Sequence, residues 1–398
     1  MSCLKLEISE RIKNIDPRPL KDMFAYGLDP QIISFACGNP DPSLFPSKEL
    51  SDIAAKVLCD KPVQSLQYGL AAGYSPLIDT LVRRLKAIEN INCNPNELII
   101  TTGAQQGMEL IAKILINEGD TVIVDEPCFI GSLNAFRSYG AKLVGVPIKD
   151  DGMDLDILEQ KLKEHPETKL IYTIPTANNP MGTTMSEQNR ERLYRIIKKY
   201  GVMTIEDNPY GELFFDGFHP TAIKSLDTEG LIIYCGSFSK ILSPGMRVGY
   251  VCANEDITDV LGTAKQTADL QTAMLPQIMA DEYLKAYDIN EHIEKLRDLY
   301  KGKCELMLEC IERYFPEGIY YTRPKGGLFL WCDLNVDIDT NVLIKKCLDQ
   351  HIAYVPGYAF MVDINKPYSS LRLNYSAVSK ENIPKGIEKL GNIIKAAL

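Results

Sequence analysis

Short apolar runs alternate with amphipathic segments along the chain from about residue 96 to residue 249. Between the runs, segments such as 104–117 and 186–200 carry apolar residues at helical spacing. Strands that alternate with helices predict an α/β fold, a mostly parallel sheet with helices on both faces. We expect seven strands in this sheet, at residues 97–101, 121–124, 142–146, 170–174, 202–205, 231–235 and 248–252.

The pattern changes after this stretch. Residues 254–314 are predominantly helical, with breaks near Pro276 and over 287–290. A smaller α+β domain is then predicted from strand patterns at 318–322, 327–333, 352–355 and 370–375 and helical patterns at 341–350 and 380–397. We expect an N-terminal arm (1–45) that joins this small domain, a large ligand-binding domain (46–285) and the small domain (286–398).

Composition excludes several classes of function. A net charge of -10 disfavours nucleic acid, whose phosphates need clustered Lys and Arg. No run approaches the roughly 20 apolar residues of a membrane-spanning helix, and the first residues lack the apolar stretch of a secretory signal. Eleven cysteines without a Cys-x-x-Cys pair, and four scattered histidines, predict no metal site. We therefore expect a cytoplasmic protein with small-molecule partners.

Lys240 lies just after the apolar run 231–235, between two serines and a later arginine. A lysine at such a position can form a Schiff base with an aldehyde cofactor. Ser237, Ser239 and Arg247 could hold a phosphate, the arginine through its planar set of donors. Pyridoxal phosphate needs both an amine that forms a Schiff base with its aldehyde and a site that holds its phosphate. Taken alone, most lysines are solvated surface charges, so the interpretation depends on other parts of the chain.

Two polar residues follow the run 202–205. Asp207 could pair with the protonated pyridine nitrogen of pyridoxal phosphate, and Tyr210 could reach the phenolic oxygen of its ring. For an isolated residue, an Asp that caps a turn before Asn208-Pro209 is the commoner interpretation. Tyr210 taken alone is equally typical of a half-buried tyrosine.

Two other strand ends carry candidate cofactor residues. Asn179 could donate to the ring oxygen, although Asn-Pro is also an ordinary turn signal. Gly103 ends one run immediately before a helical segment, where the free amides of Ala104 and Gln105 could bind a phosphate. An ordinary helix start after a strand has the same sequence pattern.

Phe129 and Arg372 are the last two candidate residues for binding the cofactor or the substrate. Phe129 follows another strand end, where its ring either stacks on the pyridine plane or lies in the core. Arg372 lies in an alternating strand pattern, so it either faces solvent or points into a cleft and binds a carboxylate through two hydrogen bonds. An amino-acid substrate supplies such a carboxylate.

Together these residues resemble the class I/II aminotransferases of pyridoxal phosphate fold type I, and most closely the kynurenine/2-aminoadipate aminotransferase branch. The similarity extends from about Ile33 to the C-terminus. Its specific marks are residues 33–40, 45–46, 67–69, 103–107, 125–127, 178–182, 206–210, 237–249, 324–327, Trp331, 356–357 and Arg372.

The resemblance implies catalytic roles for Lys240, as Schiff-base lysine and proton carrier, for Asp207, on the pyridine nitrogen, and for Tyr210. It places Asn179 and Tyr210 on the ring oxygen and Phe129 on the ring face. It places the phosphate among Gly103, Ala104, Gln105, Ser237, Ser239 and Arg247.

The resemblance further implies that Arg372 and Asn179 bind the α-carboxylate of the substrate, with Gly38 nearby. In this family the residue at Tyr68 reaches the phosphate of the neighbouring subunit, which implies a homodimer with shared active sites. Two positions depart from the family pattern. Phe129 stands where tyrosine is frequent, and residues 18–21 read Arg-Pro-Leu-Lys where many relatives have Ser-x-Ile-Arg.

The implied reaction is a ping-pong transfer of the amino group of an L-amino acid, aromatic or 2-aminoadipate-like, to a 2-oxo acid such as 2-oxoglutarate. Two alternatives remain open. A pyridoxal phosphate β-lyase acting on cysteine conjugates would use the same fold, and would release ammonia and pyruvate without an acceptor. An effector-binding protein without activity is disfavoured by the complete residue set. Some relatives carry a DNA-binding domain before this core, and none is expected here.

Overall fold

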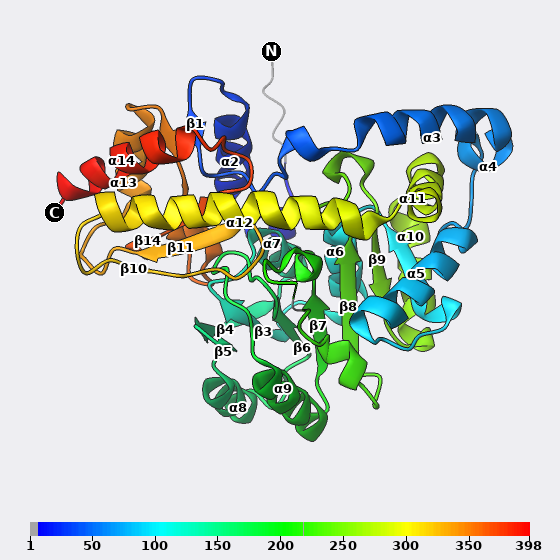
Figure 1. Ribbon diagram of the computed structural model, residues 1–398. Coiled ribbons are helices and arrows are strands. Elements are labelled where there is room, and N and C mark those ends of the chain that lie inside the picture. Colours follow the sequence, from blue (N-terminus) through cyan, green and yellow to red (C-terminus); the bar gives the residue numbers. More distant parts are fainter. Residues whose placement is uncertain (1–6, 218) are drawn as a thin grey trace, which may run out of the picture.

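The computed structural model describes residues 7–217 and 219–398. Its large sheet has eight strands in the order β2-β9-β8-β7-β6-β3-β4-β5 (Figure 1). The seven predicted strands are present, and β5 adds a short antiparallel partner at the edge. The strands are β2 Leu98–Thr101, β3 Thr121–Glu126, β4 Lys142–Lys149, β5 Gly152–Met153, β6 Leu170–Thr173, β7 Met203–Asp207, β8 Ile232–Ser237 and β9 Gly249–Cys252.

Five neighbouring strands, β8 to β4, are parallel throughout, as predicted, whereas β9 runs antiparallel to both of its neighbours. The connection between β8 and β9, residues 238–248, explains this difference. It is too short for the crossover helix that a parallel pair needs. Lys240 and Arg247 lie in this connection, so both are held at the end of β8 where the chain reverses.

The large sheet is covered by helices on both faces, because successive strand residues point to opposite sides. Ile123 and Ile171 pack in one core cluster with residues of α8 and α9, whereas Val122 and Leu170 pack in another with α6 and α7. The helices of this part are α3 Ser47–Asp60, α4 Pro62–Leu66, α5 Ser75–Glu89, α6 Ala104–Leu115, α7 Ile130–Ser138, α8 Leu155–Glu164, α9 Glu187–Tyr200, α10 Glu255–Ala268 and α11 Met274–Ala286.

A second, antiparallel sheet has the order β10-β11-β14-β13. The long helix α12 runs from the α11 end of the molecule to α14 beside this sheet (Figure 1). The elements are α12 Ile289–Tyr314, β10 Tyr320–Tyr321, β11 Phe329–Asp333, α13 Thr340–Leu348, β12 Ile352–Ala353, β13 Val355–Pro356, β14 Ser370–Asn374 and α14 Asn382–Lys395. The predicted elements of this region are therefore present.

The N-terminal residues form α1 Glu10–Lys13, α2 Arg18–Leu28 and β1 Ile33–Ser34. Strand β1 pairs in parallel with β12, which ties this segment to the C-terminal part of the chain. The predicted domain boundaries at 45/46 and 285/286 stay predictions, and residues 1–6 of the arm lie outside the described residues. In the described part of the chain, no helix has the length and apolar character needed to cross a membrane.

Candidate active site

A cavity of about 790 Å³ opens at the carboxyl ends of the parallel strands. Residues from the two sheets and from the N-terminal helix α2 line it together. Twelve of the residues singled out from the sequence are in its wall: Gly38, Ala104, Gln105, Phe129, Asn179, Asp207, Tyr210, Ser237, Ser239, Lys240, Arg247 and Arg372. These residues are spread over more than 330 positions of sequence, and the fold alone brings them together.

Lys240 is partly buried at the wall of this cavity, where its Nζ donates to the carbonyl oxygen of Gly38 at 2.7 Å. Burial, and then the positive charges of Arg372 and Arg247, lower the pKa of Lys240 to about 8. A substantial fraction of this amine is therefore neutral near pH 8, as a nucleophile or base must be. Gly38 has to be a glycine, because a Cβ there would lie 2.5 Å from the ring of Phe329.

Asp207 ends β7 and is only 3% exposed. Its Oδ2 accepts a hydrogen bond from the hydroxyl of Tyr172 at 2.8 Å, whereas its Oδ1 has no partner among the described residues. Burial raises the pKa of Asp207 to about 7, and the hydrogen bond from Tyr172 opposes that rise. A buried carboxylate oxygen without a donor is costly, so Asp207 is arranged to receive a donor from the cavity.

The N-terminus of α6 and the side chain of Arg247 form a cradle for an anion. The N-cap Gly103 has a φ of 73° and provides no side-chain cap, so the first amides of α6 have no acceptor within the helix. A Cβ at Gly103 would collide with the guanidinium of Arg247. Arg247 itself has a φ of 52°, rare for a residue with a side chain, and its Nη1 lies 3.5 Å from the hydroxyl of Ser239.

Arg372 is 2% exposed and its guanidinium lies between two aromatic rings, 4.2 Å from the centre of Phe329 and 4.9 Å from that of Phe360. Its Nη1 donates to Oδ1 of Asn179 at 2.8 Å, and its Nε has no partner among the described residues. Burial lowers the pKa of Arg372 to about 10, so the group remains positively charged at neutral pH. The side chain faces the cavity rather than solvent.

Phe129, the N-cap of α7, is partly buried in the cavity wall, so it is not enclosed in the core. Tyr210 is also in this wall and is 4% exposed, with its ring edge-on to Phe329 at 5.8 Å. Burial raises the pKa of Tyr210 well above its usual value, so its hydroxyl stays protonated. Tyr68 is not in the wall. It is 79% exposed on a loop after α4, and its predicted contact with a second subunit stays a prediction.

Several residues of the site were not identified from the sequence. Tyr172 lies inside an apolar run that predicted only a buried strand, although a buried tyrosine hydroxyl needs a partner. The arm contributes Ile15, Leu20, Met23 and Phe24 to the cavity wall, and α7 contributes Asn134. No local pattern marks the arm residues, because only tertiary packing brings α2 over the cavity.

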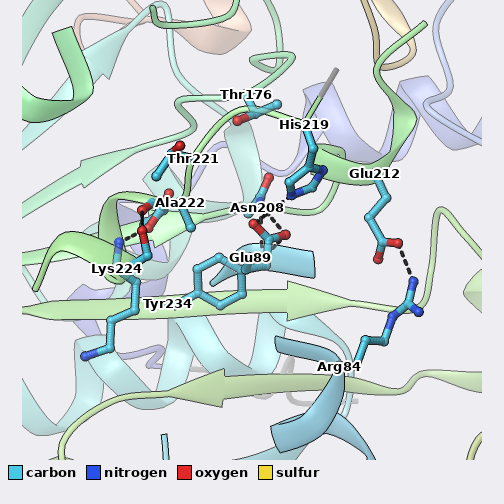
Figure 2. Close-up of polar contacts among 12 residues, drawn as sticks. Arg84, Glu89, Thr176, Asn208, Glu212, His219, Thr221, Ala222, Lys224 and Tyr234 are labelled. Carbon is cyan, nitrogen blue, oxygen red and sulfur yellow. Dashed lines mark hydrogen bonds and ion pairs between the residues drawn. The ribbon is translucent and has the colours of Figure 1, made fainter. Parts of the chain in front are cut away.

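A polar network surrounds Asn208, the residue that follows Asp207 (Figure 2). Glu89, the last residue of α5, accepts hydrogen bonds from Asn208 at 3.2 Å and from Tyr234 at 3.0 Å. His219 contacts its other oxygen at 2.9 Å. The network attaches the residue after Asp207 to α5 and β8.

Among the described residues, no group of His, Cys, Asp and Glu side chains has the arrangement of a metal site.

Comparison with known proteins shows the family of this chain. The family model for class I and II aminotransferases matches residues 31–390. The chain is 37% identical to aromatic-amino-acid aminotransferase 1 of Thermococcus litoralis, over 97% of this chain and 94% of that protein.

Two solved structures have nearly the same fold. A Pyrococcus horikoshii kynurenine aminotransferase in complex with PMP is 35% identical with a TM-score of 0.94, covering 98% of this chain and 97% of that one. An alpha-aminoadipate aminotransferase of Thermus thermophilus, complexed with N-(5'-phosphopyridoxyl)-L-leucine, is 34% identical with a TM-score of 0.91 and the same coverage. The chain therefore belongs to the class I and II aminotransferases, the fold type I enzymes whose cofactor is pyridoxal phosphate.

Proposed function

We propose that this aminotransferase moves the amino group of an aromatic or 2-aminoadipate-like L-amino acid to a 2-oxo acid, with 2-oxoglutarate as acceptor, by a ping-pong mechanism. The observation that carries the proposal is the convergence of Lys240, Asp207 and Arg372 in one cavity. Relatives named for aromatic amino acids, kynurenine and 2-aminoadipate support this choice of substrates.

Two features of the cavity fit pyridoxal phosphate. Oδ1 of Asp207 has no hydrogen-bond donor among the described residues. It therefore suits the protonated ring nitrogen, which would donate a hydrogen bond to this carboxylate oxygen. The cradle at the start of α6 suits a phosphate, which would meet the amides of Ala104 and Gln105 and the guanidinium of Arg247. Ser237 and Ser239 add hydroxyl donors, and Phe129, Asn179 and Tyr210 would surround the ring.

When bound, pyridoxal phosphate supplies an aldehyde that takes up amino groups and a ring that withdraws electrons from the carbon bearing them. Lys240 would move the proton at the α-carbon, since a pKa of about 8 allows its amine both to accept and to return a proton. Arg372 would hold the α-carboxylate, with its free Nε as one of the donors. The amino acid would leave as a 2-oxo acid, and a second 2-oxo acid would then take the amino group.

The cavity wall favours aromatic donors over donors with a second carboxylate. Among the described lining residues the only cations are Lys240, Arg247 and Arg372, and each already has a role in the proposed mechanism. The arm side chains Met23 and Phe24 add apolar surface to the wall. Asn134 provides an amide in the same wall, and it is the group we assign to the distal carboxylate of the acceptor.

Replacing Lys240 by Ala tests the proposal. We expect turnover to be abolished, and borohydride reduction to leave no cofactor on the peptide that contains residue 240. The variant Lys301→Ala is the control, since Lys301 pairs with the exposed Asp216 and does not line the cavity. Normal turnover in Lys240→Ala would refute the assignment.

A spectrophotometric screen of the twenty amino acids, kynurenine and 2-aminoadipate tests the substrate class. We expect the absorbance of the bound cofactor to change most with aromatic donors and kynurenine. Release of ammonia and pyruvate from a cysteine conjugate, in the absence of a 2-oxo acid, would instead establish a β-lyase.

We also propose a homodimer with shared sites. Exposed apolar side chains gather around α4 and the loops beside it: Val63, Leu66, Tyr68, Leu70 and Leu270. The amide of Gly69 bonds the side chain of Gln271, so the two loops lie against each other. Such a patch on one face is typical of a protein interface. The predicted cytoplasmic location stays a prediction.

A further inference from the structure

Tyr172 lies directly behind the Asp207 carboxylate. It is in β6, the strand next to β7, and its side chain is fully buried. Its ring packs edge-on against Phe136, with 5.6 Å between the ring centres, which fixes the direction of its hydroxyl. That hydroxyl donates to Oδ2 of Asp207 at 2.8 Å. A rigid strand therefore supplies a donor at one defined position.

The rest of the surroundings offers Asp207 little polar support. The buried thiols of Cys128 and Cys235 lie nearby, and the negative charge of Asp207 contributes to raising the pKa of both. Within the described chain, the Tyr172 hydroxyl is the one hydrogen-bond donor to this carboxylate. A donor on one oxygen also sets the rotation of the carboxylate, so Oδ1 is left for the cavity, whose wall Asp207 helps to form.

We propose that Tyr172 is a positioning residue for the cofactor: its hydroxyl favours the ionised form of Asp207 and turns Oδ1 toward the ring nitrogen. This inference depends on the proposed role of Asp207. The hydroxyl is a suitable donor, because burial and the neighbouring charge of Asp207 raise the pKa of Tyr172 well above its usual value. Tyr172 therefore remains a donor across the working pH range, and it does not compete for the proton that Asp207 and the ring nitrogen share.

The direction of the effect follows from the hydrogen bond. A donor to a carboxylate stabilises its charged form, so the loss of the hydroxyl raises the pKa of Asp207 further above its present value of about 7. At neutral pH most of the carboxyl group would then be protonated. It would no longer attract a protonated ring nitrogen, and it would be free to rotate.

Tyr172→Phe tests the inference, since it removes the hydroxyl and keeps the ring. We expect the pKa of the Asp207 carboxyl, followed by ¹³C NMR in the cofactor-free protein, to rise by about one unit or more. We expect the dissociation constant for pyridoxal phosphate at pH 7 to increase about five- to tenfold, with a smaller loss as the pH rises through the new pKa. Tyr172→His, which keeps a ring N–H donor, should restore part of the affinity.

The matched control is Tyr354→Phe. Tyr354 is also fully buried, and its hydroxyl donates to the carbonyl oxygen of Thr340 at 2.7 Å, away from Asp207. A Tyr172→Phe protein with a wild-type Asp207 titration and wild-type affinity would overturn the inference. So would an equal loss of affinity in Tyr354→Phe, because the effect would then be one of general stability.

Asp207→Asn separates this inference from the proposed function. If Asp207→Asn binds pyridoxal phosphate with wild-type affinity and pH dependence, Asp207 is not the partner of the ring nitrogen, and the proposed function fails at that residue. If Asp207→Asn loses affinity while Tyr172→Phe does not, only the role of Tyr172 is wrong. The NMR signal missing from Asp207→Asn also identifies the carboxyl that is followed.

Discussion

Three ionisable side chains lie in the cavity wall: Asp207 and Arg372, which are buried, and Lys240, which is partly buried. Burial shifts the pKa of each toward its neutral form, to about 8, 7 and 10 respectively. Asp207 and Arg372 each retain a polar atom without a partner among the described residues. Such groups are costly in a stable fold, and they are frequent where a ligand completes the hydrogen bonds.

Arg372→Lys tests carboxylate recognition. The planar guanidinium fits between the rings of Phe329 and Phe360, whereas an ammonium group cannot form two parallel bonds to a carboxylate. We expect KM for the amino acid to rise about tenfold to a hundredfold, because one strong hydrogen bond between charged groups is lost. The affinity for the cofactor should not change. Steady-state kinetics measure this, with the exposed Arg323→Lys as control. An unchanged KM would place the carboxylate elsewhere.

Gly103→Ala tests the phosphate cradle. The added Cβ meets the guanidinium of Arg247 at a φ of 73°, so both the backbone and the cradle are disturbed. We expect cofactor affinity to fall at least tenfold and stability to fall by about 1 kcal/mol. Gly201→Ala is the matched control, because its φ is 64° but nothing lies within 4 Å of the added Cβ. It should lose similar stability and keep cofactor affinity. Equal affinity in both variants would contradict the cradle.

At the scale of elements, the ends of the strands place the polar side chains. Strand β7 extends through Asp207 and β8 through Ser237, beyond the apolar runs that predicted them. Main-chain pairing continues past the last apolar residue, because it does not depend on the polarity of the side chain. Both side chains are thereby held on paired backbone at the wall of the cavity, which fixes their directions better than a loop would.

His219→Gln tests the network that supports the turn after β7. Burial lowers the pKa of His219, but the hydrogen bond and charge of Glu89, with a contribution from Glu212, together raise it above the unfolded value of about 6.5, and Arg297 opposes them. The stabilisation by protonated His219 is therefore complete below about pH 6.5 and disappears as the pH rises through the folded pKa.

We expect His219→Gln to cost about 1 kcal/mol of stability at pH 6 and much less at pH 9. Thermal melting at the two pH values measures this difference. The partly exposed His165→Gln is the control. A loss of the same size at both pH values would mean that His219 acts by packing rather than by charge.

At the scale of the whole molecule, the apolar patch around α4 leads to the dimer prediction. Light scattering coupled to gel filtration should give twice the chain mass of 44.6 kDa. Leu66→Asp places a charge in the proposed interface and should shift the protein toward the monomer. It should also reduce cofactor affinity and activity, because Tyr68 would no longer reach the site of the other subunit. The exposed Val342→Asp, on α13, is the control. A fully active monomer would refute the shared site.

The fold class, and most of the predicted residues that line the cavity, could be identified from the sequence. Alternating runs of apolar residues specify strands and helices through local periodicity, and polar residues that follow the runs must lie at one edge of a parallel sheet. Residues close in sequence, such as Ser237, Lys240 and Arg247, or Gly103 and Ala104, lie near one another because few residues separate them along the chain. Arg372 and Asn179 were candidates from their own sequence contexts, and the resemblance to the aminotransferases then favoured a carboxylate-binding role for both over the alternatives.

The arrangement of these groups and their pKa values depend on the tertiary structure. The hydrogen bond between Arg372 and Asn179 joins residues 193 positions apart, and the one between Tyr172 and Asp207 joins neighbouring strands. The arm that brings Met23 over the cavity is positioned by packing with no local signal. The pKa of Lys240 depends on burial and on the charges of Arg372 and Arg247, and that of Asp207 depends on burial and on the hydrogen bond from Tyr172. Orientation and dielectric environment are properties of the packed whole, so no local pattern of residues encodes them.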